Sequence, residues 1–345
     1  MEDKDMFEKE PQWERSSEIR EIQRTIRRRS WKNITISVVL AAVLLVVSVF
    51  GIIPWVESLY WNPEETNYRD ATDLDITLQA YMELFTPGYC IPTDIGYHRT
   101  GFASYELEIP LKPIGHGERF SVGGSLERNT LVLDEAFHFP EGKDYAFSRM
   151  RLPSYPDAPS DVEAQRETLR MLPEYVRVEA AISFTEDLSM EELVKFWVDM
   201  TFKSQTQDPR ANITWVAVRS KALSDEWAPF CGMSFHGNSR VYNLVDLDYR
   251  CFSGPANWDQ ESLEHHFKSL LRYSADQLEK GKGIAPYGDG ELYNEILEYV
   301  EENGVKTYGI VVVGTPQLLL ELMEHEQVYS INLMDCWLDI NWSQI

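Results

Sequence analysis

An uncharged run of 23 residues, 34–56, limits what this chain can fold into more than any other feature of its sequence. As an α-helix, with a rise of about 1.5 Å per residue, the run spans roughly 35 Å, which is enough to cross a hydrocarbon core of about 30 Å. Trp31 lies at one end and Trp55, Tyr60 and Trp61 at the other, and these residue types are enriched at membrane interfaces. The sequence therefore predicts one transmembrane helix over residues 34–56.

Basic residues gather on the N-terminal side of this span, whereas the first basic residue on its C-terminal side is Arg69. The positive-inside bias then predicts a cytoplasmic N-terminus and an extracytoplasmic C-terminal part. A cleaved signal peptide is the alternative, but its apolar region is usually about 7 to 15 residues and ends in a small-x-small site. Because this run is longer and ends in Ile53-Pro54-Trp55-Val56-Glu57, we favour an uncleaved anchor in the lipid bilayer of the cell membrane.

The formal net charge of −24 divides unevenly across the span. Residues 1–33 hold nine of the 32 basic and eight of the 56 acidic residues, which leaves 23 basic and 48 acidic residues, a net charge of −25, for the rest. Such an acidic part argues against nucleic acid or anionic lipid as its partner. It fits a soluble, self-repelling surface better than calcium binding, because no Asp-x-Asp-x-Asp-Gly loop is present. We therefore expect no metal site and no cofactor.

The cytoplasmic tail, residues 1–33, is too short for a domain but contains a helical pattern. Ser16 or Ser17 can cap a short amphipathic helix whose apolar stripe is Ile19, Ile22 and Ile26. The juxtamembrane basic cluster consists of Arg24, Arg27, Arg28, Arg29 and Lys32. Two interpretations stay open: a basic helix lying against anionic headgroups, or a docking helix for a cytoplasmic partner that contacts the three isoleucines.

The external part begins with a polar stretch, residues 57–73, that reads as a stalk, and continues with a β-rich membrane-proximal section over residues 74–150. Its first element is a helix over residues 74–85, followed by a strand over 105–111 whose apolar residues alternate with Glu106, Glu108 and Pro110. The proline predicts an edge strand. Further strands are expected at 120–122 and 130–133, with Gly123 and Gly124 between them.

Residues 160–345 show a repeated strand-helix-strand order and predict an α+β domain with helices on one face of a sheet. In the first unit, Val176 to Phe184 alternate as a strand, Ser189 and Glu192 form a capping box, and residues 213–218 form the second strand. In the second unit, a strand over 308–313 precedes a helix opened by Thr315-Pro316 and a last strand over 328–333. Two more amphipathic helices, over 263–278 and 292–300, lie between the units.

Two short histidine-containing segments are the candidates for catalytic or metal-binding chemistry. Ser234 and His236 stand in Gly232-Met233-Ser234-Phe235-His236-Gly237, but a nucleophile elbow needs Gly where His236 is, and a His two residues from a Ser on one strand is poorly placed as its base. His265 and His266 are adjacent on a helix and are expected to face its flank and the solvent, whereas helical metal ligands prefer spacings of three or four. We expect no catalytic residues.

All four cysteines follow the span, in a compartment where disulfides can persist. Four cysteines allow three pairings, and Cys231 with Cys251, which flank a predicted hairpin or loop, is the pair to test first. Buried free thiols are the equally weighted alternative. Intact mass with and without reductant decides between them.

These residues resemble the sigma factor regulator family of membrane-anchored anti-sigma proteins in Gram-positive bacteria. The resemblance covers roughly residues 25–65, for the family's N-terminal anchor module, and 160–340, for its extracytoplasmic C-terminal module. The segments that carry it are Arg27-Arg28-Arg29-Ser30-Trp31-Lys32-Asn33, Val178-Glu179-Ala180-Ala181-Ile182-Ser183-Phe184, Met190-Glu191-Glu192-Leu193, Ile213-Thr214-Trp215-Val216-Ala217-Val218 and Tyr308-Gly309-Ile310-Val311-Val312-Val313-Gly314-Thr315.

The resemblance implies an anti-sigma factor whose tail binds an extracytoplasmic-function sigma factor and whose external domain senses or binds an envelope partner. The tail has no zinc-type His-x3-Cys-x2-Cys motif, because the first cysteine is Cys90 and the first histidine His98, so sigma binding would use Ile19, Ile22 and Ile26. An accessory subunit of an envelope transporter or synthase is the alternative, and an anchored extracytoplasmic hydrolase is a weaker one.

Overall fold

The computed structural model describes residues 12–64, 66–68, 71–114, 116–133, 162–202, 211–221, 230–234 and 259–338, and in the first helix it describes side chains from Arg20 onward. The chain divides into two compact units, Met1–Tyr60 and Trp61–Ile345. Helices and strands mix in an α+β arrangement, as the sequence predicts.

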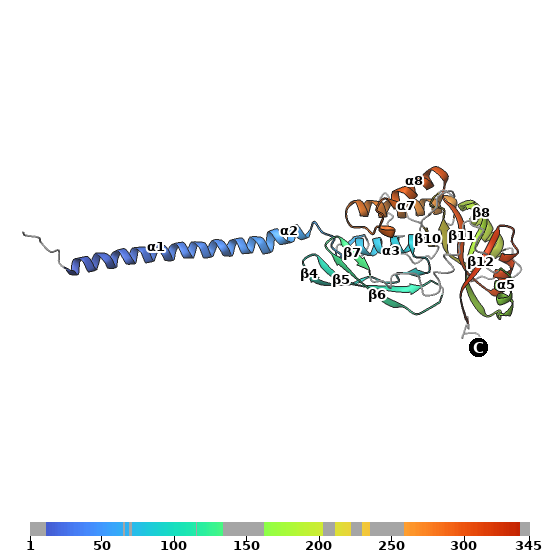
Figure 1. Cartoon of the computed structure of the whole chain (residues 1–345), viewed down its shortest axis with the longest axis horizontal. Helices are drawn as coiled ribbons and strands as arrows, with labels where there is room; N and C mark the ends of the chain where they lie inside the picture. The colour runs from blue at the N-terminus through green and yellow to red at the C-terminus, as the bar shows by residue number, and fades with distance from the viewer. Residues whose placement is uncertain are drawn as a thin grey trace, which may run out of the picture. The chain divides into compact units, whose positions relative to one another are not determined.

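The first unit is a helix that changes its winding near its C-terminal end (Figure 1). Helix α1 (Gln12–Val47) leads into a π-helical turn, η1 (Ser48–Ile52), and then into α2 (Ile53–Glu57). Pro54 has no amide hydrogen and its ring crowds the carbonyl group four residues earlier, so the preceding turn widens, and Ile53 N–H bonds to Ser48 O. The segment Arg20–Glu57 has a mean hydropathy of 3.0 in its most apolar window, which fits a membrane span.

The tail helix is therefore not a separate short element. Residues 16 and 17 lie inside α1, which begins at Gln12, so neither serine caps a helix there. The charged tail and the apolar run join without a break because no Pro or Gly interrupts residues 12–47.

The second unit begins with residues that we predicted to form a stalk. Trp61 is only 1% exposed and belongs to an apolar core, and its amide donates a 2.8 Å hydrogen bond to Asn129 Oδ1. Strands β1 (Thr66–Tyr68) and β2 (Ala71–Thr72) pair with each other. The stalk prediction for residues 57–73 is thus wrong beyond Tyr60, and Trp61 is a core residue instead of an interfacial one, because its large ring finds an apolar site in the domain.

Helix α3 (Asp73–Phe85) precedes a β-sheet that has α3 against one face. Thr72 and Asp75 form a capping box at its N-terminus. The sheet runs in the order β3-β5-β6-β7, with β4 also paired to β5. Its strands are β3 (Tyr89–Cys90), β4 (Gly96–Gly101), β5 (Ser104–Pro113), β6 (Phe120–Glu127) and β7 (Thr130–Leu133).

Strand β5 is central, so the expectation of an edge strand is wrong. Pro110 is tolerated because it lies in a gap: β4 pairs with β5 as far as Glu108, and β3 pairs from Lys112. No strand on that side needs the missing amide hydrogen of the proline. Gly123 and Gly124 lie within β6, and the chain turns instead at Arg128, whose φ is 59°.

The C-terminal sheet interleaves the two predicted strand-helix-strand units. Its order is β10-β9-β11-β8-β12, and all neighbours are antiparallel. The strands are β8 (Val176–Ser189), β9 (Asn212–Val218), β10 (Cys231–Ser234), β11 (Lys306–Gly314) and β12 (Val328–Leu338), and the crossover helices are α6 (Met190–Phe202) and α9 (Pro316–Met323). Strand β11 separates β8 from β9, and β8 separates β11 from β12, which is the ferredoxin-like split β-α-β order.

Additional helices pack around this layer. Helix α5 (Val162–Met171) packs on α9 and β12. Helix α7 (Gln260–Glu279) packs on α6, on α3 and on α8 (Leu292–Asn303), which lies beside it in Figure 1. A short 3-10 turn, η5 (Pro286–Gly288), joins α7 to α8. The largest apolar core therefore includes Ile76, Ala80, Leu84 and Phe85 of α3 together with the C-terminal sheet and its helices. The predicted boundary near residue 150 falls between residues 134 and 161, outside the described residues.

Candidate partner-binding helix

The side chains that the sequence assigns to a cytoplasmic partner lie on α1. Ile22 is 58% exposed and Ile26 61% exposed, while the side chain of Ile19 is outside the described part. Both isoleucines have the spacing of four that places side chains on the same helix face. An exposed apolar pair in water is unfavourable, so a lipid surface or a protein partner would gain free energy by covering it.

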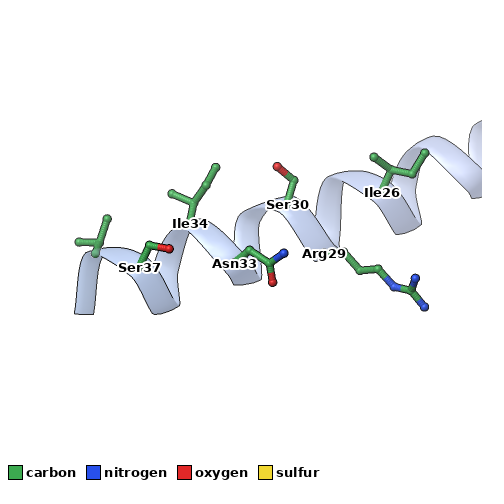
Figure 2. Close-up of a pocket in the computed structure, with 7 residues that line it drawn as sticks. Ile26, Arg29, Ser30, Asn33, Ile34 and Ser37 are labelled. Atoms are coloured by element: carbon green, nitrogen blue, oxygen red, sulfur yellow. The ribbon is translucent and has the colours of Figure 1, made fainter. Parts of the chain in front are cut away.

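The isoleucine face continues toward the span as a mixed polar and apolar strip. Figure 2 shows Ile26, Ser30 and Ile34 projecting from the helix, with Arg29, Asn33 and Ser37 beside them. Only this one helix lines the hollow, so it offers an open surface for another helix or a headgroup and not an enclosed cavity for a small molecule.

The basic cluster lies around this strip, and its positive charges are not paired with carboxylates in the described part of the chain. Arg24, Arg27, Arg28, Arg29 and Lys32 are all exposed, and within the described part of the chain no ion pair or hydrogen bond involves their charged groups. Each such cation within a Debye length of anionic headgroups contributes about 1 kcal/mol of attraction. The cluster can therefore hold this end of the span at a negatively charged membrane surface.

The second unit contains a buried polar contact that the sequence did not predict. His266 is 1% exposed, and its Nε2 donates a 2.6 Å hydrogen bond to Oε1 of Glu83, whose side chain is 3% exposed. The expectation that His266 faces the solvent is wrong, because α3 packs on the face of α7 that carries it. The sequence pattern of α3 did not indicate that Glu83 is buried, because its burial depends on the packing of α7 against α3.

A second buried charge lies at the end of β9. Arg219 Nε donates to Asp187 Oδ2 at 2.7 Å, and its guanidinium stacks on the Tyr308 ring, 4.8 Å from the centroid. Its Nη1 is buried and has no hydrogen-bond partner among the residues that the structure describes. These contacts tie the end of β9 to β8 and β11, which makes the group part of the sheet packing.

Cys231 of the candidate disulfide lies in β10. It is fully buried, its Sγ lies 3.8 Å from Val218 O, and burial raises the pKa of its thiol to about 12. Among the described residues Cys90, Cys231 and Cys336 are free cysteines. Cys251 lies outside the described residues, so the pairing of Cys231 with Cys251 stays a prediction.

The remaining chemical candidates are only partly described. Ser234 ends β10, and its hydroxyl donates to Thr214 O at 3.4 Å, while His236 lies outside the described residues. Over the ranges that the structure describes, no group of three or more His, Cys, Asp or Glu side chains could hold a metal ion.

Comparison with known proteins identifies the C-terminal part of the chain. Residues 169–335, which extend from the end of α5 into β12, match the model of the family described as sigma factor regulator C-terminal. No curated protein and no solved structure matches the chain significantly. The matched segment contains both crossover units and the inserted helices α7 and α8, and it supports a role in sigma factor regulation. Residues 169–335 thus match the C-terminal module of the sigma factor regulator family.

Proposed function

We propose that this protein is a single-pass anti-sigma factor whose cytoplasmic tail binds an extracytoplasmic-function sigma factor. The family match over residues 169–335 is the observation that carries the proposal, and a helix long and apolar enough to span a membrane accompanies it. On this model the second unit is extracytoplasmic and senses or binds an envelope partner. The orientation follows from the basic cluster on the N-terminal side of the span.

The tail would bind the sigma factor through its isoleucine stripe. Ile22 and Ile26 are exposed on one face, and an amphipathic helix that places such a stripe in an apolar groove is a recurrent mode of recognition. The surrounding arginines would favour an acidic rim on the partner. The same cluster at the headgroups would keep the stripe close to the membrane.

Capture of a sigma factor tests this proposal. The full chain with a C-terminal tag, solubilised from native membranes, is expected to retain a sigma factor that mass spectrometry identifies. Ile22→Asp should lower the recovery at least about tenfold, since a carboxylate in an apolar groove costs more than 1.4 kcal/mol. Thr25→Asp, which adds the same charge outside the stripe, is the matched control and should retain most of the binding. Absence of any sigma factor, or equal recovery with Ile22→Asp and the native chain, contradicts the proposal.

We propose no catalytic role for the second unit. What supports this is that two ionisable contacts of its described part, Glu83 with His266 and Asp187 with Arg219, join elements of the fold to one another. A broad hydrolase screen on the purified protein tests it, and turnover abolished by Ser234→Ala would overturn it.

A further inference from the structure

Four segments of the second unit meet where the chain enters it at Trp61. The amide of Trp61 bonds to Asn129 Oδ1 in the turn between β6 and β7, and the amide of Arg128 in that turn bonds to Ala103 O at 2.6 Å, in the turn between β4 and β5. Gly281 follows α7 and lies so close that a Cβ there would be 3.4 Å from Asn129 Nδ2. We call this surface, formed by residues 61–64, 99–105, 127–130 and 279–284, the tethered end.

The tethered end differs in charge from the rest of the second unit. Its cations are Arg99, Arg128, Lys280 and Lys282, of which the first three are exposed and the last is half-buried. Its carboxylates are those of Glu64, Glu127 and Glu279, so its net charge is +1. Phe102 adds an aromatic ring that is 40% exposed at the turn between β4 and β5. Residues 34–345 together carry a net charge of −25, so the tethered end, with its net charge of +1, differs in sign from the rest of this part of the chain.

The length of the chain keeps this surface close to the bilayer. Helix α2 ends at Glu57, and only residues 58–60 separate it from Trp61. Four residue steps reach at most about 14 Å. Because Trp61 is 1% exposed and hydrogen-bonded to Asn129, the tether cannot lengthen without disturbing the core.

We propose that the tethered end docks on anionic phospholipid headgroups, with Arg128, Lys280 and Lys282 at the phosphates and Phe102 at the interface. Cations near the headgroups are attracted to the negative leaflet, and aromatic rings favour the interfacial zone. The acidic remainder of the unit is repelled by the same surface, which orients the unit with this end toward the lipid. The inference rests on the single-span anchor of the proposed function but not on sigma factor binding. It revises the expectation that the whole external part avoids anionic lipid.

Hydrogen exchange of the full chain in nanodiscs tests the contact. One set of discs contains phosphatidylcholine alone, and the other contains equal parts of phosphatidylcholine and phosphatidylglycerol. Amides in residues 99–105, 127–130 and 279–284 are expected to exchange at least about threefold more slowly in the anionic discs, and the difference should fall in high salt because the attraction is screened. Amides of β11 serve as the internal reference.

Charge reversal supplies the control. Lys280→Glu/Lys282→Glu should abolish the difference between the two discs, and the single variant Arg128→Glu, in an exposed turn, should reduce it. Arg170→Glu/Lys195→Glu changes the net charge by the same amount at exposed sites outside the tethered end and should leave the difference intact.

These outcomes test the lipid contact independently of sigma factor binding. Equal exchange in both discs for the native chain overturns the lipid contact, even where sigma factor capture succeeds. Slower exchange that the control pair abolishes as fully as the Lys280 and Lys282 pair also overturns it, because net charge alone would then explain the effect. Slower exchange without sigma capture leaves the lipid contact standing and removes the anti-sigma proposal.

Discussion

Glu83 of α3 contacts the C-terminal module through two hydrogen bonds. Its carboxylate accepts from His266 Nε2 of α7, and its carbonyl oxygen accepts a 2.9 Å hydrogen bond from Trp215 Nε1 of β9. One residue of α3 therefore contacts both a helix and a strand of the C-terminal module. Because Glu83 and His266 are both buried, removal of either partner leaves a polar group without water to replace it.

We expect His266→Leu to lower the free energy of unfolding by about 3 kcal/mol, since it leaves the Glu83 carboxylate buried without its donor. Glu83→Gln should also destabilise the protein, and the double variant should cost clearly less than the sum of the two. Urea denaturation of the full chain in micelles, followed by tryptophan fluorescence, measures this coupling. Glu264→Ala, which removes a 3.9 Å partly exposed contact with Lys268 and an exposed 2.8 Å hydrogen bond from Gln260, is the control and should cost less than about 0.5 kcal/mol. Additive single effects would contradict a direct contact.

At the scale of elements, the best-predicted parts are those whose signal is local. The capping box of Ser189 and Glu192 is confirmed: Ser189 N donates to Glu192 Oε2 at 2.8 Å, and Glu192 N donates to Ser189 Oγ at 3.2 Å. Thr315 likewise caps α9 by accepting from Leu318 N. The strand that begins at Val176 is confirmed, but all of its residues from Val176 to Phe184 are buried, so both of its faces are covered and the predicted alternation does not appear in the burial. Leu193 and Phe196 are buried on their helix, as predicted.

The burial of polar residues by elements that are distant in the chain could not be predicted from the sequence. On α3, Asp75, Gln79 and Glu83 recur at spacings of four and read as a solvent face, yet each is no more than 5% exposed. Asp75 Oδ1 accepts from Ile95 N, Glu83 meets His266, and Gln79 lines a small hollow beside Cys90. The candidate partner residues on α1 were predictable as a pattern, but nothing in one sequence identifies what covers them.

The two capped helices give a prediction with a definite pH dependence. Hydrogen bonds from Ser189 lower the pKa of Glu192 below its ordinary value of 4.5, so the capping box stabilises the fold above that value and weakens as the pH falls through the lowered pKa. Ser189→Ala should cost about 1 kcal/mol at pH 7 and less in acid. Thr315→Ala, at a cap without a carboxylate, should cost a similar amount at both pH values. Urea denaturation at pH 7 and pH 4 checks both, and a cost of Ser189→Ala that does not change with pH would contradict the role of Glu192.

At the scale of the whole molecule, the family module and the folding unit have different boundaries. The family model covers residues 169–335, but the largest core also takes in Ile76, Ala80, Leu84 and Phe85 of α3. The opposite side of the same helix supplies Leu74, Leu78 and Met82 to the core of the first β-sheet. Helix α3 is thus buried between two sheets, and neither sheet has a complete core without it.

We therefore expect residues 61–345 to unfold as one cooperative unit. Leu84→Ala, at a position with 0% exposure, should cost about 2–5 kcal/mol because the cavity that it leaves cannot collapse freely. Native-state hydrogen exchange in urea should show the amides of β5 and β11 opening with the same free energy, in the native chain and in this variant. A fragment of residues 160–345 should lack a cooperative transition, since the apolar surface that α3 covers is then exposed. Separate opening of β5 and β11, or a cooperatively folded fragment, would show that α3 merely contacts the C-terminal module and is not required by its core.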